Sequence, residues 1–118
     1  MRNFKESEFD SPDLPGSGSL MSPLLLRLLD DARDKAGVAF SINSGYRTQK
    51  HNDSLPHSKP GSSHVKGLAV DIAVSGSRNR YLILDALLSV GITRIGIGDN
   101  FIHADIDSDK AQKVVWGY

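Results

Sequence analysis

The chain has 118 residues and balances 14 Lys and Arg against 14 Asp and Glu, so its formal net charge is zero. A chain of this length fits one domain with its own core, and we expect a single domain over residues 1–118. The neutral charge gives no electrostatic reason to bind nucleic acid, and no stretch approaches the roughly 20 apolar residues that span a bilayer. The absence of Cys excludes disulfides and thiolate chemistry.

Residues 1–20 are expected to form an N-terminal segment that docks on the core. Phe4 and Phe9 supply its apolar contacts, and the Ser-, Pro- and Gly-rich stretch 11–19 is typical of a loop. Residues 1–10 contain no apolar segment of the kind found in signal peptides. No export signal is therefore visible, and the localisation is left open.

The first half of the chain predicts one helix, one strand and one long loop. Ser22-Pro23 provides an N-cap and a favourable first helical residue, and apolar residues then recur at helical spacing until Gly37. This pattern predicts a helix over residues 22–36. Alternating apolar residues over 38–42 predict a half-buried strand. The polar stretch 48–63 is expected to be an irregular loop after about one helical turn.

The second half predicts a strand, a helix and a hairpin. Residues 68–74 alternate in the manner of a strand, with Asp71 on the face opposite the larger aliphatic side chains. Residues 77–90 return to helical spacing, and 94–97 and 101–106 flank a tight turn. Two main helices and about four strands favour an α+β fold, in which the helices cover one face of an antiparallel sheet.

Two histidines and an aspartate form a candidate metal site. His64 and Asp71 lie seven residues apart around Gly67, which gives backbone freedom where the loop enters the strand. Asp71 and His103 both interrupt apolar strands, where burial without a partner is costly. Two imidazoles and one carboxylate are typical of a catalytic zinc site with a fourth position left to water. The alternatives are a surface histidine at position 64 and a hydrogen-bonded core histidine at 103.

The type of ligand favours zinc among the divalent metals. Imidazole suits borderline metals, whereas magnesium and calcium prefer sites made only of oxygen atoms. Non-haem iron also accepts two His and one carboxylate, but such oxygenases usually need a jelly-roll with more strands than this chain predicts. A zinc-bound water is a hydrolytic nucleophile. The residues therefore predict one Zn²⁺ per chain and hydrolysis rather than redox chemistry.

Three motifs, in order and spacing, resemble peptidase family M15, the zinc D-Ala-D-Ala carboxypeptidases and endopeptidases. They are SGYRT at 44–48, S-x-H-x-x-G-x-A-x-D-I at 62–72, and G-I-G followed by F-I-H-A-D within 96–105. The resemblance runs from about Phe4 to the end of the sequence. It is closest to the short single-domain members found in bacteria and as phage endolysins.

The resemblance implies a hedgehog-like α+β fold with zinc held by His64, Asp71 and His103. It also implies cleavage of a peptide bond in the stem peptides of peptidoglycan. Arg47 matches the family's Ser-Gly-Tyr-Arg motif, in which the arginine lies over the metal and stabilises the substrate or the developing oxyanion. A guanidinium suits that role because its planar fork matches oxygen pairs. The alternative for Arg47 is a surface salt bridge.

The general base is where the sequence departs from the family. Many M15 members have Glu or Asp three residues before the last histidine ligand, and this position is Asn100 here. Asp105 is favoured as the base because it shares a strand face with His103, roughly 6 to 7 Å along the strand. Asp99 is the second candidate. Alternatively, Asp105 supports the ligand imidazole, or it ligates zinc itself while His103 is the catalytic imidazole.

The sequence therefore predicts a zinc peptidase that acts on peptidoglycan peptides, without a nucleic-acid partner or membrane insertion and as a monomer. Because no export signal is visible, such an enzyme would reach the wall through lysis, as a phage-encoded protein does. The alternative is a catalytically inactive M15-like domain that binds the cell wall or has a structural role. The absence of a carboxylate at Asn100 supports that alternative.

Overall fold

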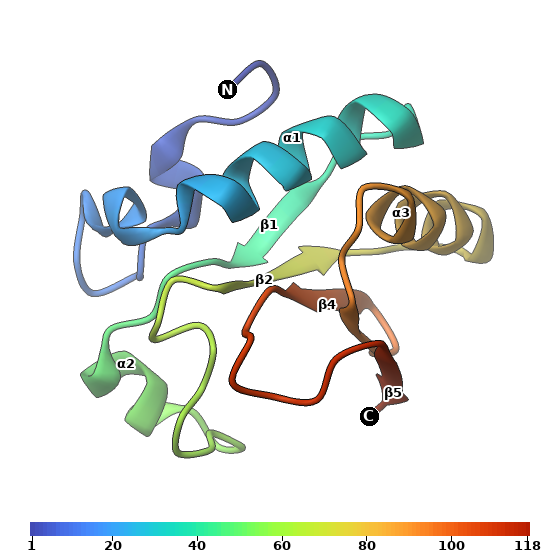
Figure 1. The fold of residues 1–118 in the computed structure, drawn as a ribbon. Helices are drawn as coiled ribbons and strands as arrows, with labels where there is room; N and C mark the ends of the chain where they lie inside the picture. Colours follow the sequence, from blue (N-terminus) through green and yellow to red (C-terminus); the bar gives the residue numbers. More distant parts are fainter.

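The computed structural model describes residues 1–118 as a mixed α+β fold, which confirms the predicted fold class. Figure 1 shows two long helices on one side of a central sheet, with a short helix and long connections on the other side. The helices are α1 (Pro23–Ala36), α2 (Gln49–Ser54) and α3 (Ser77–Ser89). The strands are β1 (Ser41–Ser44), β2 (Ala69–Ala73), β3 (Arg94–Ile97), β4 (Phe101–Asp105) and β5 (Val114–Gly117).

The sheet has five strands in the order β1-β2-β4-β3-β5, so the expectation of about four strands missed one. The first four strands pair in antiparallel fashion, as predicted, whereas β5 runs parallel to β3. The sheet is therefore mixed. The strand predicted at 38–42 lies slightly later, because Ser41 already pairs with Ala73 at the end of β2 and the residues before it have no partner strand.

Helix α1 begins and ends at the residues that the sequence predicts. The Ser22 side chain accepts a hydrogen bond from the Leu25 N–H, Pro23 is the first helical residue, and Gly37 caps the C-terminus with φ of 69°. Leu25 and Leu29 are fully buried on its inner face. Helix α1 packs against α3 and thereby closes the hydrophobic core on one face of the sheet.

The short helical stretch predicted after the SGYR motif is slightly longer than the single turn expected. Helix α2 spans six residues, and the Thr48 side chain caps it by accepting a hydrogen bond from the His51 N–H. The chain from Leu55 to Leu68 then forms turns without a helix or strand. This segment leads directly into β2 and carries His64.

The N-terminal segment docks on the core as the sequence predicts. Phe4 and Phe9 are buried and meet edge to face, with ring centroids 5.5 Å apart. The buried Asp30 carboxylate on α1 accepts hydrogen bonds from the backbone N–H groups of Arg2 and Asn3, each at 2.9 Å. These contacts fix the start of the chain against α1.

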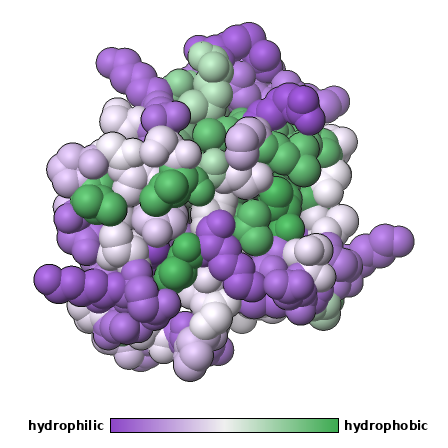
Figure 2. Space-filling view, turned by 60° about the vertical axis from the view of Figure 1, so that its left-hand side comes forward, coloured by the Kyte–Doolittle hydropathy of each residue, from purple (hydrophilic) through white to green (hydrophobic).

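Figure 2 shows the surface on the left of Figure 1, where hydrophobic side chains lie among a larger number of hydrophilic ones. The large apolar side chains that remain exposed include Leu14, Leu20 and Leu24 in the N-terminal third. None of the helices combines the length and the apolar composition that crossing a bilayer requires.

Candidate metal centre

Strands β2 and β4 place an aspartate and a histidine side by side. Asp71 pairs directly with His103 in the antiparallel register. Their strand neighbours Ile72 and Ile102 are fully buried and point into the core. Because side chains alternate along a strand, Asp71 and His103 share the opposite face, away from α1 and α3. The alternation predicted from the sequence is therefore what positions both side chains.

The loop before β2 delivers His64 to the same face. Gly67 turns the chain into β2 with φ of 72°, and a Cβ there would collide with the Leu20 carbonyl oxygen. The Gly67 carbonyl also accepts a hydrogen bond from the Ser22 N–H at 2.9 Å. The loop is thus tied to the start of α1, and only glycine fits this close approach. His64 itself is buried.

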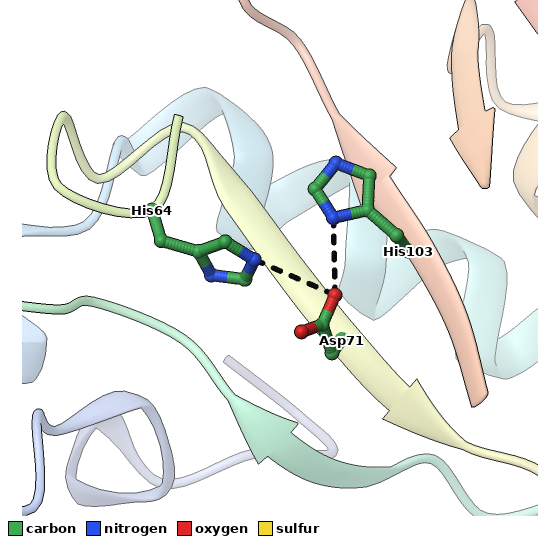
Figure 3. Close-up of side chains that lie close together, drawn as sticks. All are labelled: His64, Asp71 and His103. Carbon is green, nitrogen blue, oxygen red and sulfur yellow. Dashed lines mark hydrogen bonds and ion pairs between the residues drawn. The ribbon is translucent and has the colours of Figure 1, made fainter. Parts of the chain in front are cut away.

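One carboxylate oxygen of Asp71 faces both histidines (Figure 3). His64 Nε2 lies 3.4 Å and His103 Nδ1 lies 3.0 Å from Asp71 Oδ1. One potential ligand atom from each residue lies within 4.8 Å of the other two. The structure therefore brings together the three predicted metal ligands from a loop and two neighbouring strands.

The second ring nitrogen of each histidine is already engaged by the protein. His64 Nδ1 lies 2.8 Å from the Gly45 carbonyl, which can only accept, so Nδ1 donates and Nε2 keeps its lone pair. His103 Nε2 lies 2.7 Å from Asp105 Oδ2, and donation to this carboxylate leaves the lone pair on Nδ1. Metal-ligating histidines are usually oriented by such a bond. In these neutral tautomers both lone pairs point towards Asp71, and only a ring protonated on both nitrogens can donate to that carboxylate.

The charges at the centre fit a cation. Burial would raise the pKa of Asp71, but hydrogen bonds and charge from His103 and His64 hold that pKa well below its ordinary value. Burial would lower the pKa of His103, yet Asp105 and Asp71 raise it above its ordinary value. Three acceptor atoms that face one another repel unless a proton or a metal ion lies among them. The donor set therefore fits a divalent metal such as zinc.

Arg47 lies on the other oxygen of Asp71. Its Nη2 donates to Asp71 Oδ2 at 3.2 Å, its Nε donates to Ser44 Oγ at 3.0 Å, and its Nη1 donates to Asn52 Oδ1 at 3.3 Å. A register shift in β1 brings Ser44 opposite Asp71. This pairing places the Ser44 Oγ, which accepts from Arg47, beside the site. The predicted Arg47 thus joins the cluster, with N–H groups left over beyond these three contacts.

The family comparison agrees with this geometry. The family model described as Peptidase M15 matches residues 2–105, which is most of the chain. The chain belongs to peptidase family M15. A search of curated proteins found no match.

In this M15 member, Asp105 also lies at the site, but behind His103. Its Oδ2 accepts from His103 Nε2, and its Oδ1 accepts from Arg94 Nε at 2.7 Å and from the Asp107 N–H at 3.1 Å. Burial would raise the pKa of Asp105, but these partners keep it below its ordinary value. The carboxylate is fully buried, and it contacts the nitrogen of His103 that faces away from Asp71. The group of atoms that could hold a metal ion consists of the two histidine nitrogens and the Asp71 oxygen, without Asp105.

The second predicted carboxylate, Asp99, lies at the turn between β3 and β4. Asp99 is exposed, as is the neighbouring Asn100, and the Asp99 carbonyl accepts a hydrogen bond from the Arg80 guanidinium. The Asn100 carbonyl accepts from the Val74 N–H at 2.9 Å, which anchors the turn to the end of β2. The structure thus places Asp99 two residues before the start of β4, at the end of that strand away from Asp105.

Several polar groups that support the M15 site were not predicted. The buried Asp107 accepts from Ser63 Oγ at 2.7 Å and from Lys66 Nζ at 3.1 Å, on both sides of His64. Asn52, which holds Arg47, is also buried. No local sequence pattern identifies these contacts. Ser63 and Asp107 are distant in sequence, and the contact between Arg47 and Asn52 depends on the rotamers of the two side chains. By contrast, the run of β-branched and aromatic residues at 114–116 was a readable strand signal.

Proposed function

We propose that this M15 family member is a zinc-dependent peptidase that hydrolyses a peptide bond in peptidoglycan stem peptides. The observation that carries the proposal is the convergence of His64 Nε2, Asp71 Oδ1 and His103 Nδ1, with both other ring nitrogens engaged by the protein. Three protein ligands of this kind leave a position for water, which distinguishes a catalytic zinc site from a closed structural one.

Each ligand would contribute to hydrolysis in a defined way. Zinc, when bound in such a site, acidifies a water molecule and polarises the substrate carbonyl. Asp71 would supply one oxygen to the metal, while Arg47 holds its second oxygen in place. The hydrogen bond from His64 to the Gly45 carbonyl and the one from His103 to the Asp105 carboxylate fix the tautomers of the two rings. Neither ring then has to reorient when the metal binds.

Arg47 would also stabilise negative charge on the substrate. Its guanidinium is mostly buried, since 16% of the side chain is exposed, and three acceptors define its plane. The N–H groups that remain can donate to a substrate carbonyl or to the oxyanion that forms from it. Burial lowers the pKa of Arg47 and the Asp71 carboxylate opposes this effect, but the group stays charged near neutrality.

We assign different roles to the two predicted carboxylates. Both oxygens of Asp105 already accept hydrogen bonds inside the protein, so we propose that Asp105 orients His103 rather than moving a proton. Asp99 is exposed on the turn before β4 and, as the other predicted carboxylate, is the remaining candidate for the proton transfer. Asp99→Asn is then expected to lower kcat and leave the zinc affinity unchanged. An unaltered kcat would remove Asp99 from the mechanism.

The proposed function is tested with purified protein, zinc and peptidoglycan. We expect one tightly bound zinc per chain by elemental analysis, and newly freed amino groups or D-alanine on incubation with cell walls. His64→Ala should lose the metal and the hydrolysis together, because it removes one of three ligands. Full wall hydrolysis by a metal-free His64→Ala protein would contradict the proposal.

A second candidate function is a wall-binding M15 domain without catalysis. The observation that favours it is the lack of a carboxylate at Asn100, together with the engagement of both Asp105 oxygens. This candidate predicts that the protein binds zinc and sediments with cell walls but frees no amino groups. The same assay therefore separates the two functions.

A further inference from the structure

Strand β5 extends the row of residues that contains the metal ligands. In the register of the sheet, Asp71 pairs with His103, His103 pairs with Gly96, and Gly96 pairs with Trp116. Residues paired in register project from the same face of a sheet. Trp116 therefore stands on the face that carries the metal centre, separated from His103 only by a residue without a side chain.

Gly96 leaves the space that Trp116 occupies. A Cβ at position 96 would lie 2.7 Å from Trp116 Nε1 and 2.8 Å from Trp116 Cε2, closer than carbon atoms approach without displacement. The indole thus leans across Gly96 and reaches His103, with ring centroids 5.5 Å apart and an interplanar angle of 49°. Contacts of this geometry between aromatic rings are favourable and restrict the rotation of both.

Trp116 also contacts Arg94, which holds the carboxylate that orients His103. The Arg94 guanidinium carbon lies 5.0 Å from the centre of the indole, which is a cation–π distance. Arg94 donates to Asp105, and Asp105 accepts from His103 Nε2. The indole therefore contacts both ends of the chain of interactions that runs from Arg94 through Asp105 to the imidazole.

We propose that Trp116 is a positioning residue for His103 and that zinc affinity depends on it. The indole prevents the imidazole from turning away from Asp71 and holds Arg94 in place against Asp105. The family match ends at Asp105, so β5 is an addition to the site from outside the matched residues. The inference rests on the proposed zinc centre.

The test compares zinc dissociation constants measured by competition with a chelator. Trp116→Leu is expected to weaken zinc binding about 10-fold, the lower end of the effect of removing an orienting group. Trp116→Phe should recover most of the affinity, because it keeps an aromatic ring beside His103. The control is Val115→Ala, an exposed neighbour that belongs to the same strand but not to this row. A Trp116→Leu protein with wild-type affinity would overturn the inference.

Gly96→Ala provides an independent test that keeps the tryptophan. The added methyl should displace the indole, together with the Tyr118 ring whose Cε2 would lie 2.8 Å from the new Cβ, and weaken zinc binding. Gly117→Ala, whose Cβ meets nothing within 4 Å, should not. Wild-type affinity in Gly96→Ala would also contradict the inference. Unfolding midpoints of the metal-free variants separate positioning from stability: a purely structural role lowers the midpoint and leaves the affinity of the folded protein unchanged.

Fluorescence adds a direct signature, since Trp116 is the only tryptophan in the sequence. Zinc should change its emission in the wild-type protein and not in His103→Ala. An emission spectrum that stays constant while calorimetry shows a bound ion would count against the contact with His103. A wild-type protein that binds no zinc would instead refute the proposed function, so the two failures are distinguishable.

Discussion

His64 and His103 direct one ring nitrogen each to the same oxygen of Asp71, but the protein holds them in different ways. His64 stands on a loop, and its second nitrogen donates to the backbone carbonyl of Gly45. His103 stands on a strand and donates to the buried carboxylate of Asp105. A backbone carbonyl is a neutral acceptor fixed by the fold, whereas a carboxylate also makes the imidazole more basic.

The two histidines consequently depend on different kinds of residue. The orientation of His64 depends on glycines that allow backbone segments to approach closely, such as Gly45 and Gly67. The orientation of His103 depends on side-chain charge, through Asp105 and Arg94. Adding a methyl group at Gly45 or Gly67 should therefore disturb His64, whereas removing the charge of Asp105 should disturb His103.

Removal of the shared oxygen should have the largest effect, because both histidines face it. Asp71→Ala is expected to abolish measurable zinc binding in calorimetry and hydrolysis with it, since two imidazoles alone do not complete a three-ligand site. Asp109→Ala is the control, because Asp109 is an exposed aspartate with 82% of its side chain accessible. Stoichiometric zinc in Asp71→Ala would show that the ion is bound elsewhere.

The charged support of His103 should have the next largest effect. Asp105→Asn is expected to weaken zinc binding by about 10- to 100-fold, the usual cost of changing a partner of a ligand histidine. An amide cannot accept from both His103 and Arg94 through two oxygens, so one contact is lost. Chelator competition measures the effect, with Asp99→Asn as the comparison. Equal affinities for Asp105→Asn and wild type would mean that the carboxylate does not orient the imidazole.

The backbone support of His64 should respond to a single methyl group. A Cβ at position 45 would lie 2.8 Å from Phe9 Cα, so Gly45→Ala must shift the end of β1 and the carbonyl that holds His64. We expect a loss of about 1 to 3 kcal/mol in unfolding free energy, typical of overpacking, and weaker zinc binding. Urea unfolding of the metal-free protein measures the first effect. Gly117→Ala is the matched control, and a Gly45→Ala protein as stable as this control would break the comparison.

The three candidate ligands could be predicted from the sequence because each follows from a local pattern. Asp71 and His103 interrupt alternating apolar strands, and Gly67 marks the turn that brings His64 to them. Helix α1 was equally readable, since its caps are determined by neighbouring residues. Periodicity and capping act over a few residues, so the sequence displays them directly.

The supporting contacts could not be predicted, because they depend on the tertiary structure. The strand pattern correctly placed Asp105 on the face of His103, but only the rotamers show that the two side chains bond through Nε2. Ser63 and Asp107 meet across 44 residues of sequence, a pairing that no local signal specifies. Strand β5 was missed although its β-branched and aromatic residues are a readable strand signal; only its parallel pairing with β3 depends on the tertiary structure.

Asp107 links the two histidine supports and should have the smallest effect, confined to stability. Burial would raise its pKa, but Ser63 and Lys66 lower it to about 2. A carboxyl with a lowered pKa stabilises the folded state above its unfolded pKa, near 3.8, and this contribution disappears as the pH falls through the folded value.

Asp107→Asn is therefore expected to cost about 1 to 2 kcal/mol of unfolding free energy at pH 7, because it removes the carboxylate charge. The loss is no larger because the Lys66 partner is partly exposed, so solvent screens the ion pair. The difference from wild type should shrink between pH 5 and pH 2, roughly the interval set by the two pKa values. Urea midpoints measured across this range test the sign. Asp109→Asn, which also contacts Lys66 but from an exposed position, should show almost no difference at any pH. A pH-independent loss in Asp107→Asn would assign its role to the Ser63 hydrogen bond rather than to charge.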